Sequence, residues 1–219
     1  HADQMCVINS MFTDVPNHPQ AFMMMHTGEF RFTRPSMGAW VLYGLGTENQ
    51  NLPGFVTISP PNNLGGAQNY SSAFLPAIYQ GTPLGREGQK VASAGIGNIV
   101  SRHLPTDLQR EQLDLVQALN REMLARKRVH AELEGVIESY ELAFRMQDAL
   151  PDVLDLKGES PETMELYGIG AGPSDDFGRQ CLMARRLAEA GVRFIEVTHG
   201  SWDQHNNLRN ALGNNAKAI

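Results

Sequence analysis

The chain has 219 residues, of which 42% are hydrophobic and 19% are charged, enough apolar sequence for one sizeable core or two small ones. Eighteen Lys and Arg residues against 24 Asp and Glu residues give a net charge of −6, and no basic tract offers a surface for nucleic acid. The apolar stretches are too short to span a membrane.

The first predicted elements are a strand and a helix. Residues 4–9 are rich in Val and Ile, and we expect them to form a short buried strand. A helix is expected to follow over residues 19–25, with Asn17 or His18 as its N-cap. Gly28 is a typical residue for the end of that helix.

The middle of the chain changes in character twice. A helix is expected over residues 36–45 and a strand over 52–59. Glycines punctuate residues 60–104, which we interpret as an irregular surface excursion. Residues 105–150 have apolar positions at helical spacing and are predicted to form a long helical insertion, with a break near Lys127-Arg128.

The last third of the chain has the clearest signals. Helices are predicted over 160–168 and 175–190, and the second has one apolar face. The run Val-Arg-Phe-Ile-Glu-Val-Thr at 192–198 is the strongest strand signal in the sequence. A polar loop at 199–205 follows that strand, and a further helix is expected to begin near Asn207.

Strands separated by helices predict an α/β fold with a mainly parallel sheet. Three strands are fewer than a doubly wound sheet normally has. The chain also begins at His1 directly before a strand-like run and stops at Ile219 within a helical pattern. We therefore expect a single, incomplete domain over residues 1–219.

Cys6 and Cys181 are the only cysteines. Two thiols are too few for a disulfide-stapled scaffold and cannot form a thiolate zinc site alone. Each lies in an apolar pattern, so we expect both to be buried free thiols.

Two polar segments follow predicted strands, where ligands bind in open α/β sheets. His18 and Asn17 follow the first strand, at a helix start whose N–H groups attract anions. The positive end of the helix dipole favours a neutral His18, which is able to act as base, nucleophile or metal ligand. The alternative is that Asn17 or His18 only caps the helix.

The second polar segment contains Asp203 and His205. A carboxylate and an imidazole two positions apart in a loop can converge on one cation, such as zinc, calcium or magnesium, if further ligands come from elsewhere. The alternative is a simple capped turn. His199, at the end of the strand, is a candidate substrate-binding residue or a half-buried structural histidine.

Several blocks of sequence resemble those of a known family, and they occur in the same order along nearly the whole chain. They are residues 3–11, Asn17-His18, residues 35–40, 138–143, 166–168 and 177–187, and Trp202-Asp203-Gln204-His205. They resemble the domain-of-unknown-function family 1501. That resemblance implies a sulfatase-like member of the alkaline phosphatase superfamily, with a three-layer α/β/α sandwich and a divalent metal at the carboxyl edge of its sheet.

The resemblance also bears on mechanism. His26-Thr27-Gly28 is similar to the Leu-Thr-Gly motif that follows the sulfatase nucleophile, and this alignment puts His18 where sulfatases carry formylglycine and phosphatases carry Ser or Thr. A phosphohistidine-type intermediate, attack by metal-bound water or the absence of catalysis would each fit that departure. Asp203-Gln204-His205 is similar to the superfamily's Asp-x-x-x-His ligand pair, with one ligand displaced, and relatives carry further ligands before His1 and after Ile219.

The sequence thus favours a metal-dependent hydrolase of sulfate or phosphate esters, with small molecules or glycans as substrates. Family members are mostly exported bacterial proteins, so the resemblance implies a periplasmic or extracellular location. The alternative is a non-catalytic, sulfatase-like protein that binds an anionic glycan or a protein partner. A purely structural domain is the third interpretation.

Overall fold

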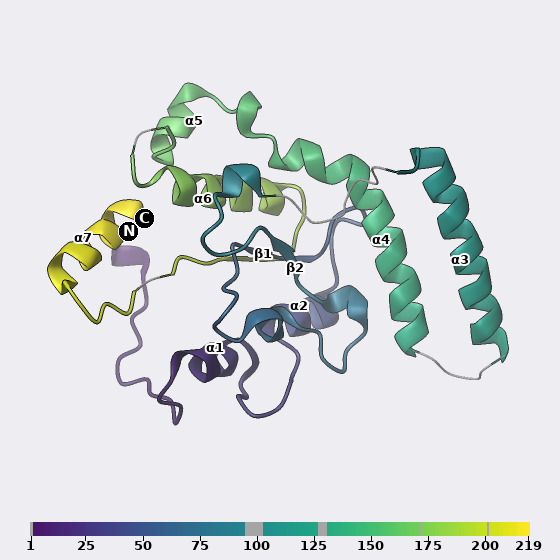
Figure 1. Cartoon of the computed structure of the whole chain (residues 1–219), viewed down its shortest axis with the longest axis horizontal. Helices are drawn as coiled ribbons and strands as arrows, with labels where there is room; N and C mark the ends of the chain where they lie inside the picture. The colour runs from purple at the N-terminus through teal and green to yellow at the C-terminus, as the bar shows by residue number, and fades with distance from the viewer. Residues whose placement is uncertain (1, 95–102, 127–130, 171, 201) are drawn as a thin grey trace.

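A sheet of three parallel strands lies at the centre of the structure, a computed structural model that describes residues 2–94, 103–126, 131–170, 172–200 and 202–219 (Figure 1). Its strands are β1 (Phe55–Ile58), β2 (Thr82–Leu84) and β3 (Phe194–Val197), in the order β2-β1-β3. Because all pairs are parallel, the carboxyl ends of the three strands share one edge.

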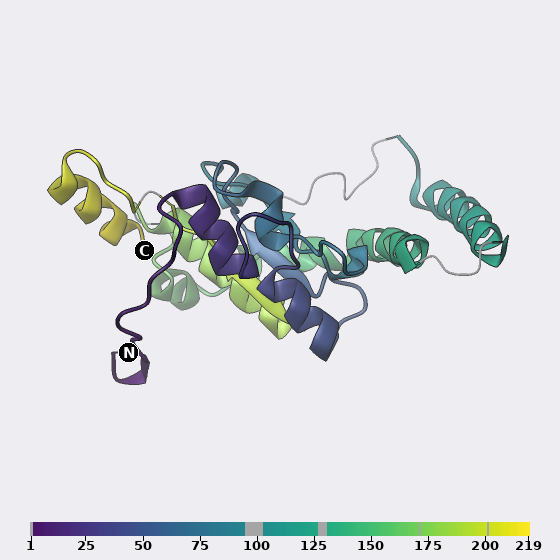
Figure 2. The same ribbon diagram turned by 90° about the horizontal axis from the view of Figure 1, so that it is seen from below.

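Helices surround this sheet and extend to either side of it (Figures 1 and 2). They are α1 (His18–Thr27), α2 (Met37–Leu45), α3 (Thr106–Arg126), α4 (Ala131–Leu154), α5 (Pro161–Leu166), α6 (Asp175–Glu189) and α7 (Leu208–Ala218). None of these helices, within the residues described, is both long and apolar enough to cross a membrane.

One face of the sheet packs against α2. Phe55 of β1 and Phe194 of β3 meet edge to face on it, with ring centroids 5.0 Å apart. Gly38 of α2 lies directly over both rings, since a Cβ there would come within 2.6 Å of Phe55 and 2.7 Å of Phe194. The absence of a side chain at this position lets the helix approach the sheet closely.

The opposite face of the sheet packs against α6 and the end of α4. Val56 and Ile58 of β1 are buried there in one cluster with Leu182 and Leu187 of α6 and Leu150 of α4. These β1 residues alternate with Phe55 and Thr57, as the twofold period of a strand requires. Helices therefore cover both faces, and the expected α/β class with a parallel sheet is confirmed.

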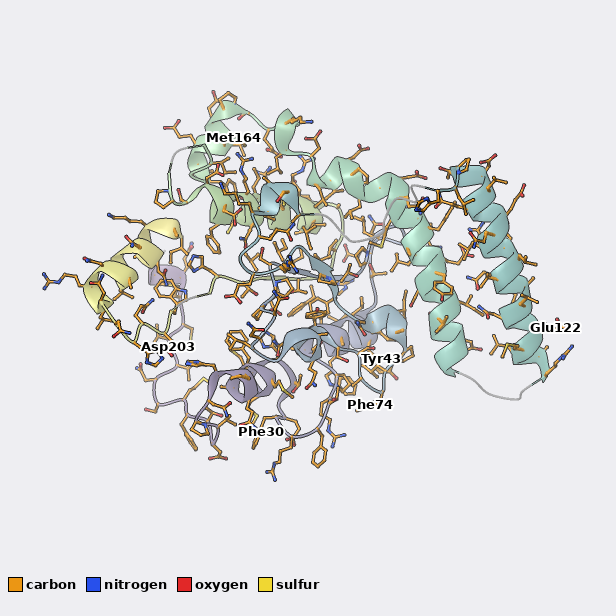
Figure 3. The ribbon with its side chains drawn as sticks, viewed as in Figure 1. Phe30, Tyr43, Phe74, Glu122, Met164 and Asp203 are labelled. Atoms are coloured by element: carbon orange, nitrogen blue, oxygen red, sulfur yellow. The ribbon has the colours of Figure 1, made fainter. Side chains whose placement is uncertain are left out.

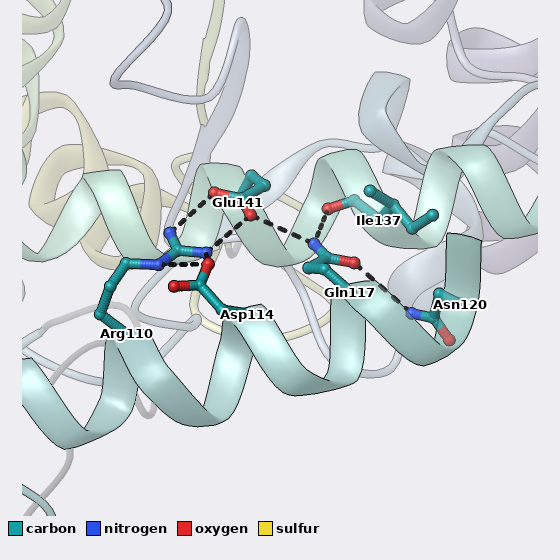
Figure 4. Close-up of polar contacts among 6 residues, drawn as sticks. All are labelled: Arg110, Asp114, Gln117, Asn120, Ile137 and Glu141. Atoms are coloured by element: carbon teal, nitrogen blue, oxygen red, sulfur yellow. Dashed lines mark hydrogen bonds and ion pairs between the residues drawn. The ribbon is translucent and has the colours of Figure 1, made fainter. Parts of the chain in front are cut away.

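The predicted helical region at 105–150 is an antiparallel pair, α3 and α4, linked by polar contacts (Figure 4). Arg110 of α3 forms ion pairs with Asp114 and with Glu141 of α4, and it holds the pKa of Glu141 below its usual range. Gln117 is fully buried and donates to the carbonyl of Ile137 at 2.9 Å. The break expected at Lys127-Arg128 lies outside the described residues.

The strand predicted at residues 4–9 is wrong. The segment begins with a 3-10 helix, Ala2–Gln4, and continues without regular structure. Val7 is 74% exposed and Cys6 is also exposed, so the expected burial of that thiol is wrong too, whereas Cys181 is half-buried. High β propensity makes no strand unless a neighbouring backbone supplies the hydrogen bonds.

The strand that completes the sheet is β2, from the segment predicted to be irregular. It escaped prediction because it is only three residues long and contains Pro83, which lacks the N–H that a ladder uses. Pro83 is tolerated because β2 pairs with β1 alone, at the edge of the sheet.

Gly178→Ala should destabilise the protein, because a Cβ at Gly178 in α6 would meet the carbonyl oxygen of Tyr167 at 2.0 Å. A backbone atom cannot move aside cheaply, so we expect the free energy of unfolding in urea to fall by about 1–3 kcal/mol. Gly213→Ala in α7 is the matched control, since nothing lies within 4 Å of a Cβ there. Equal stability of the two variants would contradict the packing described.

Candidate functional site

Three of the residues predicted to carry chemistry meet at one point. Nε2 of His18, the first residue of α1, lies 2.7 Å from Oδ2 of Asp203, which is 185 residues away in the sequence. Nε2 of His205 lies 2.7 Å from the same oxygen. Asp203 belongs to the segment between β3 and α7, on the side of the molecule where α1 begins (Figure 3).

The side chains of this cluster are open to solvent, with exposed fractions of 61% for His18, 46% for Asp203 and 80% for His205. The hydrogen bond from His18 and the charges of both histidines hold the pKa of Asp203 below its usual range. Because an ionised carboxylate only accepts hydrogen bonds, a neutral His18 bonded to it carries its proton on Nε2. Its Nδ1 is then an acceptor.

Asn17 acts as the N-cap of α1. Its Oδ1 accepts from the backbone N–H of Gln20 at 3.1 Å, and its Nδ2 donates to the side chain of Gln20 at 2.9 Å. Pro19 has no N–H, and the N–H of Ala21 donates to the carbonyl of Asn17. The expected anion site at this helix start therefore has fewer available donors than the sequence suggested.

His199 has neighbours other than the cluster of His18, Asp203 and His205. Its ring contacts two aromatic rings, with centroids 5.3 Å from Phe177 and 5.8 Å from Trp202. Its Nδ1 is buried and, within the part of the chain that the structure describes, has no hydrogen-bond partner. An aromatic setting fixes the ring, and an unpartnered nitrogen leaves it able to bind a ligand.

A pocket of about 370 Å³ lies beside His199, at the carboxyl edge of the sheet. It is lined by Ser59, Glu87, Gly88, Gln89, Lys90, Asp176, Gln180, Thr198, His199, Gly200 and Asn215. Of these, the sequence predicts only His199 as a candidate site residue, and Ser59, Gln180 and the other lining residues were not anticipated. The one signal for Ser59 in the sequence is its position at the end of the predicted strand 52–59, since open α/β sheets bind ligands beyond the ends of their strands.

His26 forms a contact between α1 and β3. Its Nδ1 lies 2.7 Å from the carbonyl oxygen of Phe22, and its Nε2 lies 3.0 Å from Oε1 of Glu196. The side chains are 14% and 22% exposed, so this pair is much less solvated than the His18 cluster. Both ring nitrogens face acceptors, an arrangement that suits the protonated imidazole.

The His18 cluster has donors of the right kind for a divalent ion. One carboxylate and two imidazoles are a common ligand set for zinc and for other transition metals. Nε2 of His18 and Nε2 of His205 each contact the carboxylate of Asp203 directly. In a metal site the three groups would instead point at an ion that lies between them. Accordingly, no group of three or more His, Cys, Asp or Glu side chains among the described residues is arranged to hold a metal ion.

Comparison with known protein families gives one match over residues 1–219, to a family described as a protein of unknown function, DUF1501. The chain belongs to the DUF1501 family. A search of the curated proteins and a search of the solved structures gave no match.

The His26–Glu196 contact should make the stability of this DUF1501 chain depend on pH. Burial lowers the pKa of His26, but the hydrogen bond and charge of Glu196 and the Phe22 carbonyl outweigh it, so the pKa is raised above 6.5. A raised pKa in the folded state stabilises the protein fully below 6.5 and loses that stabilisation as the pH rises through the folded value.

The measurement is the free energy of unfolding in urea between about pH 5.5 and about pH 8 for the DUF1501 chain and its His26→Gln variant. Subtracting the unfolding free energy of the variant from that of the unmodified chain cancels the contributions of the other histidines, which both proteins share. We expect that difference to favour the unmodified chain most at the acid end and to shrink toward the alkaline end. A difference that is constant with pH would show that His26 does not change its protonation on unfolding.

Proposed function

We propose that the chain is part of a metal-dependent hydrolase of sulfate or phosphate esters, as the resemblance to sulfatase-like proteins of the alkaline phosphatase superfamily suggests. In this proposal the sheet belongs to the three-layer α/β/α sandwich of that superfamily, and the protein acts in the periplasm or outside the cell. The observation that carries the proposal is the convergence of His18, from the start of α1, on Asp203 and His205.

Folding energy does not explain this convergence well. Ion pairs as exposed as His18–Asp203 and His205–Asp203 contribute little to stability, because water screens them and ordering the side chains costs entropy. Three ionisable groups held together in solvent, at a helix start and after a strand, are better accounted for by chemistry at that point.

In the proposed site Asp203 and His205 would hold a divalent ion, of which zinc suits the donors best and calcium or magnesium are alternatives. When bound, such an ion polarises an ester oxygen as a Lewis acid. Asp203 also fixes the tautomer of His18, as the carboxylate does in a catalytic Asp-His pair, and so leaves Nδ1 as a proton acceptor.

His18 would then act as the general base. Nδ1 takes a proton from a water molecule while the water oxygen forms the new bond to sulfur or phosphorus. The bond from that atom to the alcohol oxygen breaks on the side opposite the attacking water, the departing oxygen takes a proton from solvent, and His18 releases its proton to water. Sulfate or phosphate and the alcohol are the products, and His18 returns to its neutral form.

Variants at two positions separate ion binding from proton transfer. Asp203→Ala should remove both the bound metal, measured by elemental analysis, and the turnover of 4-methylumbelliferyl sulfate or phosphate. His18→Gln should keep the metal and lower turnover by about 10²–10⁴-fold, the usual loss of a general base. Asp148→Ala, an exposed aspartate on α4, is the matched control and should change neither quantity.

Circular dichroism would establish that each variant is folded before its metal content is read. Unchanged turnover in Asp203→Ala would rule out the proposed hydrolase. If Asp203→Ala keeps its full metal content but loses turnover, the ion is bound elsewhere. The assignment of Asp203 as a metal ligand would then be overturned.

The second candidate is a non-catalytic protein that keeps the sulfatase-like domain and binds an anionic glycan or a protein partner. It is favoured by the direct contact of both imidazoles with Asp203, which leaves no three-ligand arrangement for an ion among the described residues. It predicts saturable binding of a sulfated glycan with no hydrolysis of either methylumbelliferyl ester.

A further inference from the structure

The pocket at the carboxyl edge of the sheet receives residues from all three strand ends. Ser59 directly follows β1, Glu87 and Lys90 lie in the segment after β2, and His199 lies two residues beyond the end of β3. Parallel sheets place their ligands at this edge because the loops after neighbouring strands meet there. The volume, about 370 Å³, is at the low end of the usual range for small-molecule sites.

Three residues that line this pocket each have a polar side-chain atom that is buried without a hydrogen-bond partner among the described residues. The atoms are Oγ of Ser59, Oε1 of Gln180 and Nδ1 of His199. Ser59 and Gln180 are each only 5% exposed. A buried polar atom without a partner is costly, and native structures contain few of them. Three such atoms, on residues that line a single pocket, are consistent with a bound ligand that supplies the missing partners.

The orientation of Gln180 is fixed by its neighbours. Its Nε2 donates to Oδ2 of Asp176 at 3.0 Å, while Oδ1 of Asp176 accepts from the backbone N–H of Val91 at 2.8 Å. The amide cannot be reversed, because its oxygen would then face a carboxylate that has no proton to donate. Oε1 of Gln180 therefore requires a donor from the ligand.

The charges around the pocket argue against an anion. Glu87 and Asp176 line it with carboxylates, Lys90 is the one Lys or Arg among the described residues that line it, and Oε1 of Gln180 is an acceptor. Sulfate or phosphate oxygens would face acceptors on several sides. A hydroxyl group can both donate and accept a hydrogen bond. A ligand with several hydroxyl groups can therefore donate to Gln180 and also form hydrogen bonds with Ser59 and His199.

The backbone at Ser59 is also unusual. Its φ of 53° lies in the left-handed region, which a residue with a Cβ adopts at a cost. Its N–H donates to the carbonyl of Leu84 at 3.0 Å, so the end of β1 is bonded to the end of β2 in this conformation. Backbone strain of this kind is concentrated at binding sites, where it aims a side chain.

We propose that this pocket binds a neutral polyhydroxylated ligand, such as an uncharged sugar unit. One hydroxyl donates to Oε1 of Gln180, and others bond to Oγ of Ser59 and Nδ1 of His199. The rings of Phe177 and Trp202 hold the imidazole in place for that contact. This proposal is independent of ester hydrolysis at the His18 cluster, whose residues do not line the pocket.

The test is calorimetric titration of the protein with glucose, galactose and inositol, beside glucose 6-sulfate and glucosamine. Ser59→Gly removes the hydroxyl and suits the left-handed backbone, and His199→Phe keeps an aromatic ring beside Phe177 and Trp202 without its nitrogens. Each variant should weaken binding of the uncharged ligands by about three- to tenfold, the usual effect of one hydrogen bond.

Ser10→Gly is the matched control, because Ser10 also has a positive φ, 66°, and is exposed outside the pocket. It should leave binding unchanged. The proposal is overturned if none of the uncharged ligands binds, or if Ser59→Gly and His199→Phe both bind them as the unmodified protein does. Tighter binding of glucose 6-sulfate or glucosamine than of glucose would overturn the neutral class of ligand.

Discussion

Strand β1 has no contact with water on either face, and the arrangement of the other elements follows from that. All four of its residues are buried, so helices have to cover both sides, with α2 over Phe55 and α6 over Val56 and Ile58. Strands β2 and β3 supply the hydrogen bonds at its two edges. Because both neighbours run parallel to β1, the segments that leave the sheet emerge at one edge, and the pocket lies there.

The sequence predicted the helices better than the sheet, because helix signals are local. Ser36 caps α2 through the N–H of Ala39, and Gly28 ends α1 in the left-handed conformation, as their residue types indicate. Strand formation depends on distant partners. Residues 5–8 have strong β propensity and form no strand, whereas Thr82–Leu84 has little and forms one, because only the latter lies beside β1.

The candidate site also has features that the local sequence predicted and features that depend on the tertiary structure. Asp203 and His205 are two positions apart, so their association was visible locally, and His18 was singled out for its place at a helix start. The contact between His18 and Asp203 depends on the tertiary structure, because the two residues are 185 positions apart in the sequence. From the sequence alone, Gln180 is an ordinary polar residue of a predicted amphipathic helix. Its unpartnered oxygen becomes apparent only when its Nε2 is seen to donate to Asp176, whose other carboxylate oxygen accepts from the backbone N–H of Val91.

The exposed N-terminal segment has a consequence for work with the chain in solution. Val7, Ile8, Met11 and Phe12 are each at least 69% exposed, in a stretch without regular structure. Such a run offers apolar side chains, and backbone that belongs to no helix or strand, to any other copy that it meets, which is how edge-to-edge aggregation begins. Self-association at high protein concentration would therefore start from these residues, and a solubilising substitution placed there would leave the buried sheet untouched.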